Sequence, residues 1–144
     1  ATCMGRYLQV ANVGDSRLYV VNNTIKQITT DHSYVEEMIR RGNLERENAR
    51  SNPNKNIITR AVGAKSEIKA DIYVVELKPG DLVLMCSDGL SNMLEDEDIR
   101  MIIKRQRDIV EMAEKLVEAA NNNGGKDNIS VVLIEPFADE VNYD

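Results

Sequence analysis

The sequence predicts one domain of mixed α and β structure, an α+β fold in which strands come first, helices follow and a strand closes the chain. Three observations support this prediction. Runs rich in β-branched and aromatic residues occupy the first half of the 144 residues. Two segments of the second half repeat apolar residues at helical spacing. The length suits a single hydrophobic core, and neither an internal repeat nor a linker interrupts it.

The first strands are expected at residues 7–13 and 17–21, on either side of a Gly-Asp-Ser turn at 14–16. Asn22-Asn23 then predicts a tight turn, because Asn tolerates positive φ, and a third strand follows at 24–29. The three segments are expected to form a meander of neighbouring strands.

A change of period at Ser33 predicts a helix that ends at Gly42, since glycine commonly terminates helices. The polar residues 43–56 predict a short helix and an exposed, mobile excursion. Strands are expected to resume at 57–61 and at 68–77.

A turn with Pro79 and Gly80 leads into an apolar run that predicts a buried strand. Two amphipathic helices follow. The acidic residues 95–98 lie where the first of them begins, because carboxylates favour the positive end of the helix dipole. The elements expected in this half are the strand 82–86, helices around 99–103 and 109–120, a stop at 122–125, the strand 129–134 and an acidic tail at 137–144.

Charge and composition exclude several classes of protein. The chain has 18 basic and 24 acidic residues, and this net charge of -6 argues against nucleic acid or a membrane surface as a partner. No apolar stretch approaches the roughly 20 residues that span a bilayer, and no secretory leader is visible, so we expect a cytoplasmic protein. Cys3 and Cys86 predict no disulfide framework, and Cys86 is expected to be a buried, inert thiol.

Three aspartates, Asp15, Asp88 and Asp127, lie just outside predicted strands. Asp88 follows one buried strand and Asp127 precedes another, so antiparallel pairing of those strands would bring both carboxylates to one rim of the sheet. Asp15 would reach this rim from its own hairpin connection. Clustered carboxylates require a compensating cation, and their oxygens suit magnesium or manganese rather than zinc. The single histidine, His32, cannot build an imidazole-rich site and is expected to stabilise its loop.

Taken one at a time, each aspartate could be only a turn former, since Asp-Gly and Asp-Asn pairs are common in turns. Five stretches in register weigh against that explanation: VANVGDSR (10–17), TDHS (30–33), NIITRAVG (56–63), GD to CSDGL (80–90) and KDNIS (126–130). Together they resemble the protein phosphatase 2C family, the metal-dependent (PPM) serine/threonine protein phosphatases, and its bacterial members most. The resemblance extends from residue 7 to about residue 136.

The resemblance implies a four-layer αββα sandwich with antiparallel central sheets, of which residues 1–136 would be the C-terminal portion. It implies two core Mn²⁺ or Mg²⁺ ions held in part by Asp88 and Asp127, and a third, weaker position served by Asp15 together with Asp88. The implied reaction is hydrolysis of phosphoserine and phosphothreonine by a metal-activated water, with no covalent intermediate. The implied partners are phosphoprotein substrates of a Ser/Thr kinase. Residues 43–56 match the family's flap beside the site, which influences substrate choice.

The first half of the family's domain supplies an early acidic ligand and an Asp-Gly loop that bridges both metals, and neither is found here. The chain begins at Ala1 without an initiator methionine and is interpreted as a piece of a longer protein, inactive by itself. Two alternatives stay open. One is a non-catalytic, phosphatase-shaped binding or regulatory domain. The other is an unrelated hydrolase or nucleotide-binding module, which is disfavoured because Gly124-Gly125-Lys126 lacks the following Ser or Thr of a P-loop.

Overall fold

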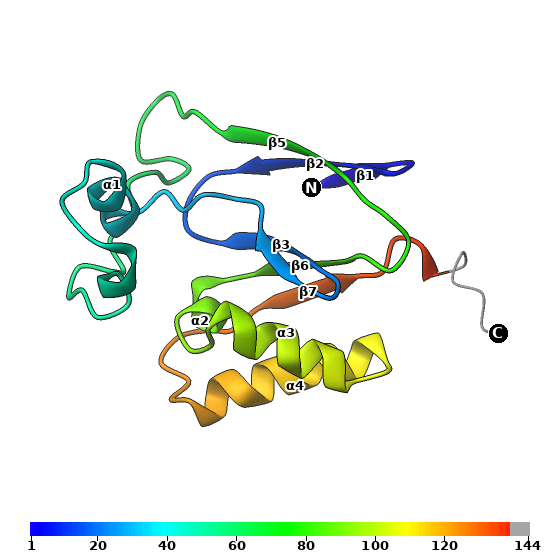
Figure 1. The fold of residues 1–144 in the computed structure, drawn as a ribbon. Coiled ribbons are helices and arrows are strands. Elements are labelled where there is room, and N and C mark those ends of the chain that lie inside the picture. Colours follow the sequence, from blue (N-terminus) through cyan, green and yellow to red (C-terminus); the bar gives the residue numbers. More distant parts are fainter. Residues whose placement is uncertain (139–144) are drawn as a thin grey trace.

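The computed structural model describes residues 1–138, which form two antiparallel β-sheets lying face to face (Figure 1). Sheet A has the strand order β1-β2-β5, and sheet B has the order β4-β3-β6-β7. The strands are β1 (Thr2–Met4), β2 (Tyr7–Asn12), β3 (Arg17–Val21), β4 (Ile25–Gln27), β5 (Asp71–Glu76), β6 (Leu82–Cys86) and β7 (Val131–Ile134). The helices are α1 (Tyr34–Arg40), the 3-10 helix η1 (Arg46–Asn48), α2 (Asp88–Ser91), α3 (Asp96–Arg105) and α4 (Ile109–Asn122). The predicted α+β class with antiparallel sheets is confirmed.

Two apolar clusters hold the layers together. Leu8 and Val10 of β2 face Leu18 and Val20 of β3 in the core between the sheets. A larger cluster lies between sheet B and the helices α2, α3 and α4. Its buried members are Tyr19, Val21, Leu84, Cys86, Leu90, Leu94, Ile99, Ile103, Leu116 and Ala120. Strand β3 contributes to both clusters because successive side chains of a strand point to opposite faces.

Capping interactions fix the helix ends that the sequence predicted. The Ser33 hydroxyl accepts a hydrogen bond from the backbone N–H of Glu36 at 3.2 Å, and Gly42, with φ of 77°, ends α1. At the start of α3, the Asp98 carboxylate accepts from the Glu95 N–H at 3.1 Å. The acidic run at 95–98 therefore belongs to a helix N-terminus, as expected.

Two predictions about strands are wrong. The segments 7–13 and 17–21 do not form a meander, because β2 pairs with β1 and β5 while β3 pairs with β4 and β6. The turn between them is no hairpin: it carries the chain from sheet A to sheet B, and Gly14 adopts a φ of 111° there. Within residues 1–138, the segment 57–61 makes a single bridge, from Ile58 to Ser33, and pairs with no strand.

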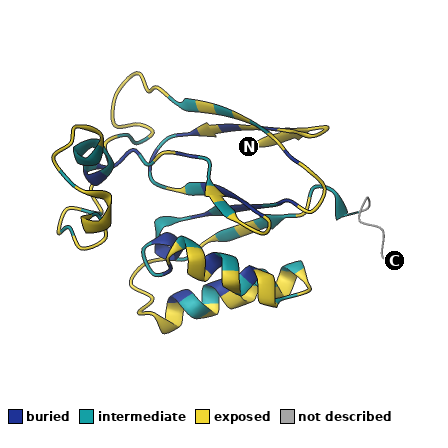
Figure 2. Ribbon diagram, in the orientation of Figure 1, coloured by how far each residue is buried: buried dark blue, intermediate teal, exposed yellow. Residues whose placement is uncertain are grey.

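The outer face of sheet A is exposed. Helices cover only sheet B in the described part of the chain, so three of the four layers that the resemblance implied are formed there (Figures 1 and 2). Ile72 and Val74 of β5 are 68% and 63% exposed on the uncovered face, an unusual position for two β-branched apolar side chains in neighbouring pleats.

Most of the predicted acidic tail, from residue 139 onward, lies outside the described residues. Phe137, at its start, is partly buried and packs against the core between the sheets. None of the described helices combines the length and the apolar character that crossing a membrane requires.

Candidate metal centre

Strand register brings the three predicted aspartates to one end of sheet B. Arg17 of β3 pairs with Cys86 of β6, and Cys86 pairs in turn with Val131 of β7, so these three residues form one row across the sheet. Asp15 lies just before this row and Asp127 lies shortly before its last member, while Asp88 follows Cys86 and opens helix α2. The antiparallel pairing of β6 and β7 that the sequence analysis required is therefore present.

Hydrogen bonds from Ser87 hold the loop of Asp127 against the turn of Asp88. The Ser87 N–H donates to the carbonyl oxygen of Ser130 at 3.0 Å, and the Ser130 N–H donates back to the Ser87 hydroxyl oxygen at 3.0 Å. The Ser87 hydroxyl donates to the carbonyl oxygen of Asn128 at 3.3 Å. The residues directly before Asp88 and directly after Asp127 are thus joined.

Gly89 brings the two backbones into direct contact. A Cβ atom at this position would overlap the carbonyl oxygen of Asn128 and would lie 2.8 Å from its carbonyl carbon. Only glycine therefore allows the start of α2 to approach the loop so closely. This contact explains the glycine of the Ser-Asp-Gly motif at 87–89. Gly89 follows the candidate ligand Asp88 and touches Asn128, the neighbour of the candidate ligand Asp127.

Asp15 and Asp88 line the same cavity, of about 280 Å³. Burial raises the pKa of the partly buried Asp15 carboxyl, and the charges of Asp88 and Asp31 raise it further. A divalent cation between Asp15 and Asp88 would remove this repulsion. Mg²⁺ is commonly held by one or two carboxylates and several waters, so the donor pair fits a hard divalent ion.

Asp127 stands apart from that cavity. It is exposed, and its carboxylate accepts a hydrogen bond from the N–H of Asn128 at 2.7 Å. Within residues 1–138, no three His, Cys, Asp or Glu side chains gather closely enough to hold a metal ion. The convergence of Asp88 and Asp127 on a shared ion stays a prediction, and further ligands would have to come from water or from other parts of the protein.

A partly buried group of polar side chains near Asp15 was not anticipated. Arg17 donates from Nη2 to the Asp31 carboxylate at 2.8 Å and from Nη1 to the Tyr19 hydroxyl at 3.0 Å. That hydroxyl donates to Asp96 of α3 at 3.0 Å. Arg17 and Asp31 are 14 positions apart and Tyr19 and Asp96 are 77 apart, so no local pattern could have revealed these two contacts. These hydrogen bonds hold the start of β3, which follows Asp15 in the sequence, against Asp31 and against helix α3.

The thiol of Cys86 takes no part in the site. Burial raises its pKa to about 12, so the thiol stays protonated and unreactive near neutral pH. The prediction of a buried, inert cysteine is confirmed, since Cys86 is only 5% exposed.

Replacing Asp15 by Asn is expected to change stability and metal binding in opposite directions. Because the pKa of Asp15 is raised, its ionised form destabilises the metal-free fold, and this cost appears as pH rises through the raised pKa. Asp15→Asn should therefore stabilise the metal-free protein at pH 7 by at most about 1 kcal/mol, since the group is partly exposed. Thermal unfolding in chelator and in manganese tests this. A less stable variant in chelator would contradict the assignment of repulsion at Asp15.

The chain is thus an α+β sandwich with Asp15 and Asp88 beside one cavity at the end of sheet B. The model of the family described as protein phosphatase 2C matches residues 1–129. The chain belongs to the protein phosphatase 2C family.

Named relatives agree with this assignment. The chain is 44% identical over 127 residues to the serine/threonine phosphatase stp of Listeria welshimeri and 43% identical over 125 residues to the protein phosphatase PhpP of Streptococcus pneumoniae. These matches cover 88% and 86% of this chain but only 50% and 51% of the relatives, so the chain spans about half of their length.

Solved structures show the same fold. The serine/threonine phosphatase of S. agalactiae superposes with a TM-score of 0.87 at 38% identity, over 91% of this chain and 55% of that one. The catalytic domain of the serine/threonine protein phosphatase PstP, solved in complex with two manganese ions, gives a TM-score of 0.80 at 32% identity, over 91% of this chain and 54% of its own.

Proposed function

We propose that this chain is the C-terminal portion of a metal-dependent protein phosphatase that hydrolyses phosphoserine and phosphothreonine. The observation that carries the proposal is the direct contact of the Asp88 turn with the Asp127 loop, at the sheet end where Asp15 also lies. Relatives named as serine/threonine phosphatases support the substrate class. The opposing enzyme would be a Ser/Thr kinase, and the proposed compartment is the cytoplasm.

Each aspartate has a proposed role. Asp88 and Asp127 would help to hold two Mn²⁺ or Mg²⁺ ions, and Asp15 with Asp88 would serve a third, weaker position. Bound ions would supply charge neutralisation at the phosphoryl group and a water activated for attack. The serines at the site are proposed as structural rather than nucleophilic, because Ser87 and Ser130 are hydrogen-bonded to each other.

The remaining half of the enzyme is expected to be indispensable. Two or three carboxylates give weak metal sites, and the uncovered face of sheet A with Ile72 and Val74 is where we propose that further helices pack. Residues 1–144 alone should release no phosphate from a phosphothreonine peptide in manganese, whereas the complete protein should do so and lose the activity in chelator. Chelator-resistant hydrolysis by the complete protein would contradict the proposal. Binding of the peptide without hydrolysis would favour the non-catalytic alternative.

Residues 43–56 contact the site region through Arg50. Its guanidinium donates to the carbonyl oxygens of Ser91, Asn92 and Leu94 at 2.9, 3.2 and 2.8 Å. These carbonyls lie at the C-terminal end of helix α2 and just beyond it, and the first residue of this helix is Asp88. We propose that Arg50 fixes the 43–56 segment beside the catalytic end of the sandwich, where a protein substrate would meet it.

Arg50→Ala in the complete protein is therefore expected to lower kcat/KM for a phosphopeptide about tenfold. The substitution removes three hydrogen bonds that a charged side chain donates. Hydrolysis of a small aryl phosphate should change by less than about twofold, since it needs no contact with the segment. Arg41→Ala is the matched control, because Arg41 forms a local ion pair with Glu37 on α1 in the described part of the chain. Equal losses on both substrates would count against a role in substrate choice.

A further inference from the structure

The single histidine of the chain holds the residue that precedes Asp15. The Gly14 N–H donates to Nδ1 of His32 at 3.0 Å, and the His32 N–H donates to the Gly14 carbonyl oxygen at 2.9 Å. Both residues are buried, and His32 is only 6% exposed. His32 thus contacts both the N–H and the carbonyl oxygen of Gly14 and helps to fix the orientation of this residue.

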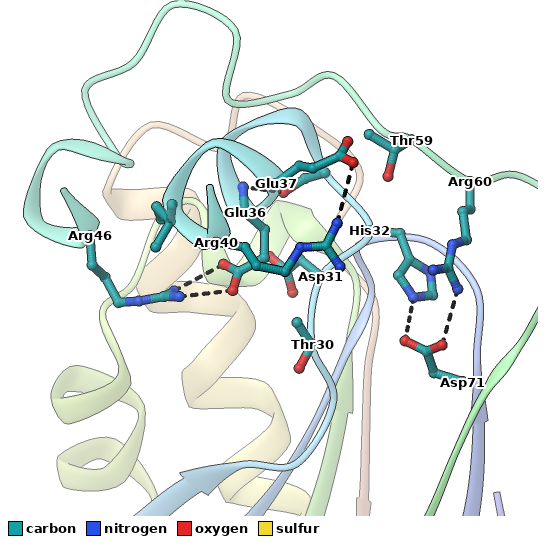
Figure 3. Close-up of a pocket in the computed structure, with 12 residues that line it drawn as sticks. Thr30, Asp31, His32, Glu36, Glu37, Arg40, Arg46, Thr59, Arg60 and Asp71 are labelled. Atoms are coloured by element: carbon teal, nitrogen blue, oxygen red, sulfur yellow. Dashed lines mark hydrogen bonds and ion pairs between the residues drawn. The ribbon is translucent and has the colours of Figure 1, made fainter. Parts of the chain in front are cut away.

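The other ring nitrogen of His32 faces a carboxylate. Nε2 lies 2.7 Å from an Asp71 oxygen, and Arg60 donates to the second Asp71 oxygen at 3.0 Å (Figure 3). Arg60 also donates to the carbonyl oxygen of Lys69 at 3.0 Å. These contacts lower the pKa of Asp71, with the hydrogen bond from His32 as the largest cause. The row Arg60, Asp71, His32 and Gly14 is therefore continuous.

The direction of these hydrogen bonds fixes the tautomer. Nδ1 can accept the Gly14 N–H only if it carries no proton, so the ring proton lies on Nε2 and points to Asp71. An ionised carboxylate beside Nε2 stabilises this tautomer, as outer partners do for other functional imidazoles. Arg60 in turn keeps the carboxylate charged and oriented.

The surroundings explain why the acceptor matters. Gly14 lies between the end of β2 at Asn12 and the start of β3 at Arg17, so no strand pairing satisfies its N–H, and a buried N–H requires a partner. Among the residues that the structure describes, the acceptor of this N–H is the His32 ring. The His32 carbonyl oxygen also accepts from the N–H of Thr59, a residue that follows the 43–56 segment.

We propose that His32, oriented by Asp71 and Arg60, is a positioning residue that fixes the Gly14–Asp15 turn and with it the metal position served by Asp15. This inference rests on the proposed function. It goes further because it assigns to His32, Asp71 and Arg60 a role in holding the turn that carries Asp15. His32 touches neither metal nor substrate in this role.

Two variants separate the halves of the ring. The amide oxygen of Asn can take the place of Nδ1, whereas the amide nitrogen of Gln can take the place of Nε2. His32→Asn should therefore keep the acceptor for the Gly14 N–H, and His32→Gln should keep only the contact with Asp71. Calorimetric titration of the complete protein with Mn²⁺ measures the binding event that Asp15→Ala abolishes. His32→Gln should weaken that event about tenfold or more, and His32→Asn should leave it within about threefold of wild type.

The Gly14 amide proton gives a readout that needs neither metal nor activity. In metal-free protein its NMR signal and its protection from hydrogen exchange should resemble wild type in His32→Asn and should be altered in His32→Gln. Wild-type values in both variants, equal losses in both, or a wild-type protein without an Asp15-dependent Mn²⁺ event would each overturn the proposal. A failure of the proposed phosphatase function alone would give a different result. Replacing Asp88 or Asp127 would then leave hydrolysis unchanged, while the Gly14 amide would still differ between His32→Asn and His32→Gln.

Discussion

Replacing Asp88 or Asp127 by Ala in the complete protein is expected to lower manganese-dependent hydrolysis of a phosphothreonine peptide roughly 10²–10³-fold. Each substitution removes a carboxylate from the proposed site of two metal ions. Charge neutralisation by such ions stabilises the transition state by several kcal/mol. Initial rates over a range of manganese concentrations measure the effect. Partial recovery at high manganese is expected, because the site loses affinity rather than its whole framework.

Glu118→Ala is the control for this pair. Glu118 is an exposed acid on α4 that pairs with Lys115, so its loss changes the net charge equally without touching the sheet end. It should retain the wild-type rate. If Asp88→Ala and Asp127→Ala also retained that rate, neither residue would belong to a catalytic metal site.

Gly89→Ala is expected to damage both activity and stability. The added Cβ would overlap the Asn128 carbonyl oxygen, so the start of α2 and the Asp127 loop must move apart. Overpacking of this kind costs about 1–3 kcal/mol of folding free energy. Displacement of catalytic groups by about 1 Å can cost 10²-fold in rate, so we expect a loss of about that size. Denaturant unfolding and rate measurements on the same preparation test both effects.

Ile103→Val is the matched control for stability. Ile103 is buried in α3, away from the sheet end, and the smaller side chain should cost about 0.5–1.5 kcal/mol. Activity should be kept at temperatures where this variant is folded. If Gly89→Ala were as active as Ile103→Val, the close approach of the two loops would be irrelevant to catalysis.

Local patterns were sufficient to predict most of the elements. Helix α1 followed from Ser33 and Gly42, and α4 followed from apolar residues at helical spacing. The sheet to which a strand belongs was not predictable in this way, because a content of β-branched residues does not specify which strands pair with each other. The transfer of the chain between sheets at Gly14 depends on tertiary packing, as does the failure of residues 57–61 to find a neighbouring strand.

The candidate ligands were visible in the sequence for a different reason. Asp15, Asp88 and Asp127 each stand between an apolar strand and small or polar residues, a local signal that survives without a structure. The groups that support them give no such signal. His32 meets Asp71 across 39 positions of sequence, and Arg50 reaches the carbonyl oxygen of Leu94 across 44. Only the folded chain brings these residues together.

The most direct test is a crystal structure of the complete protein grown in manganese, with anomalous diffraction used to locate the ions. Manganese coordinated by both Asp88 and Asp127, with a weaker peak beside Asp15, is the predicted result. Asp88 and Asp127 carboxylates turned away from each other, with no anomalous peak between them, would contradict the account.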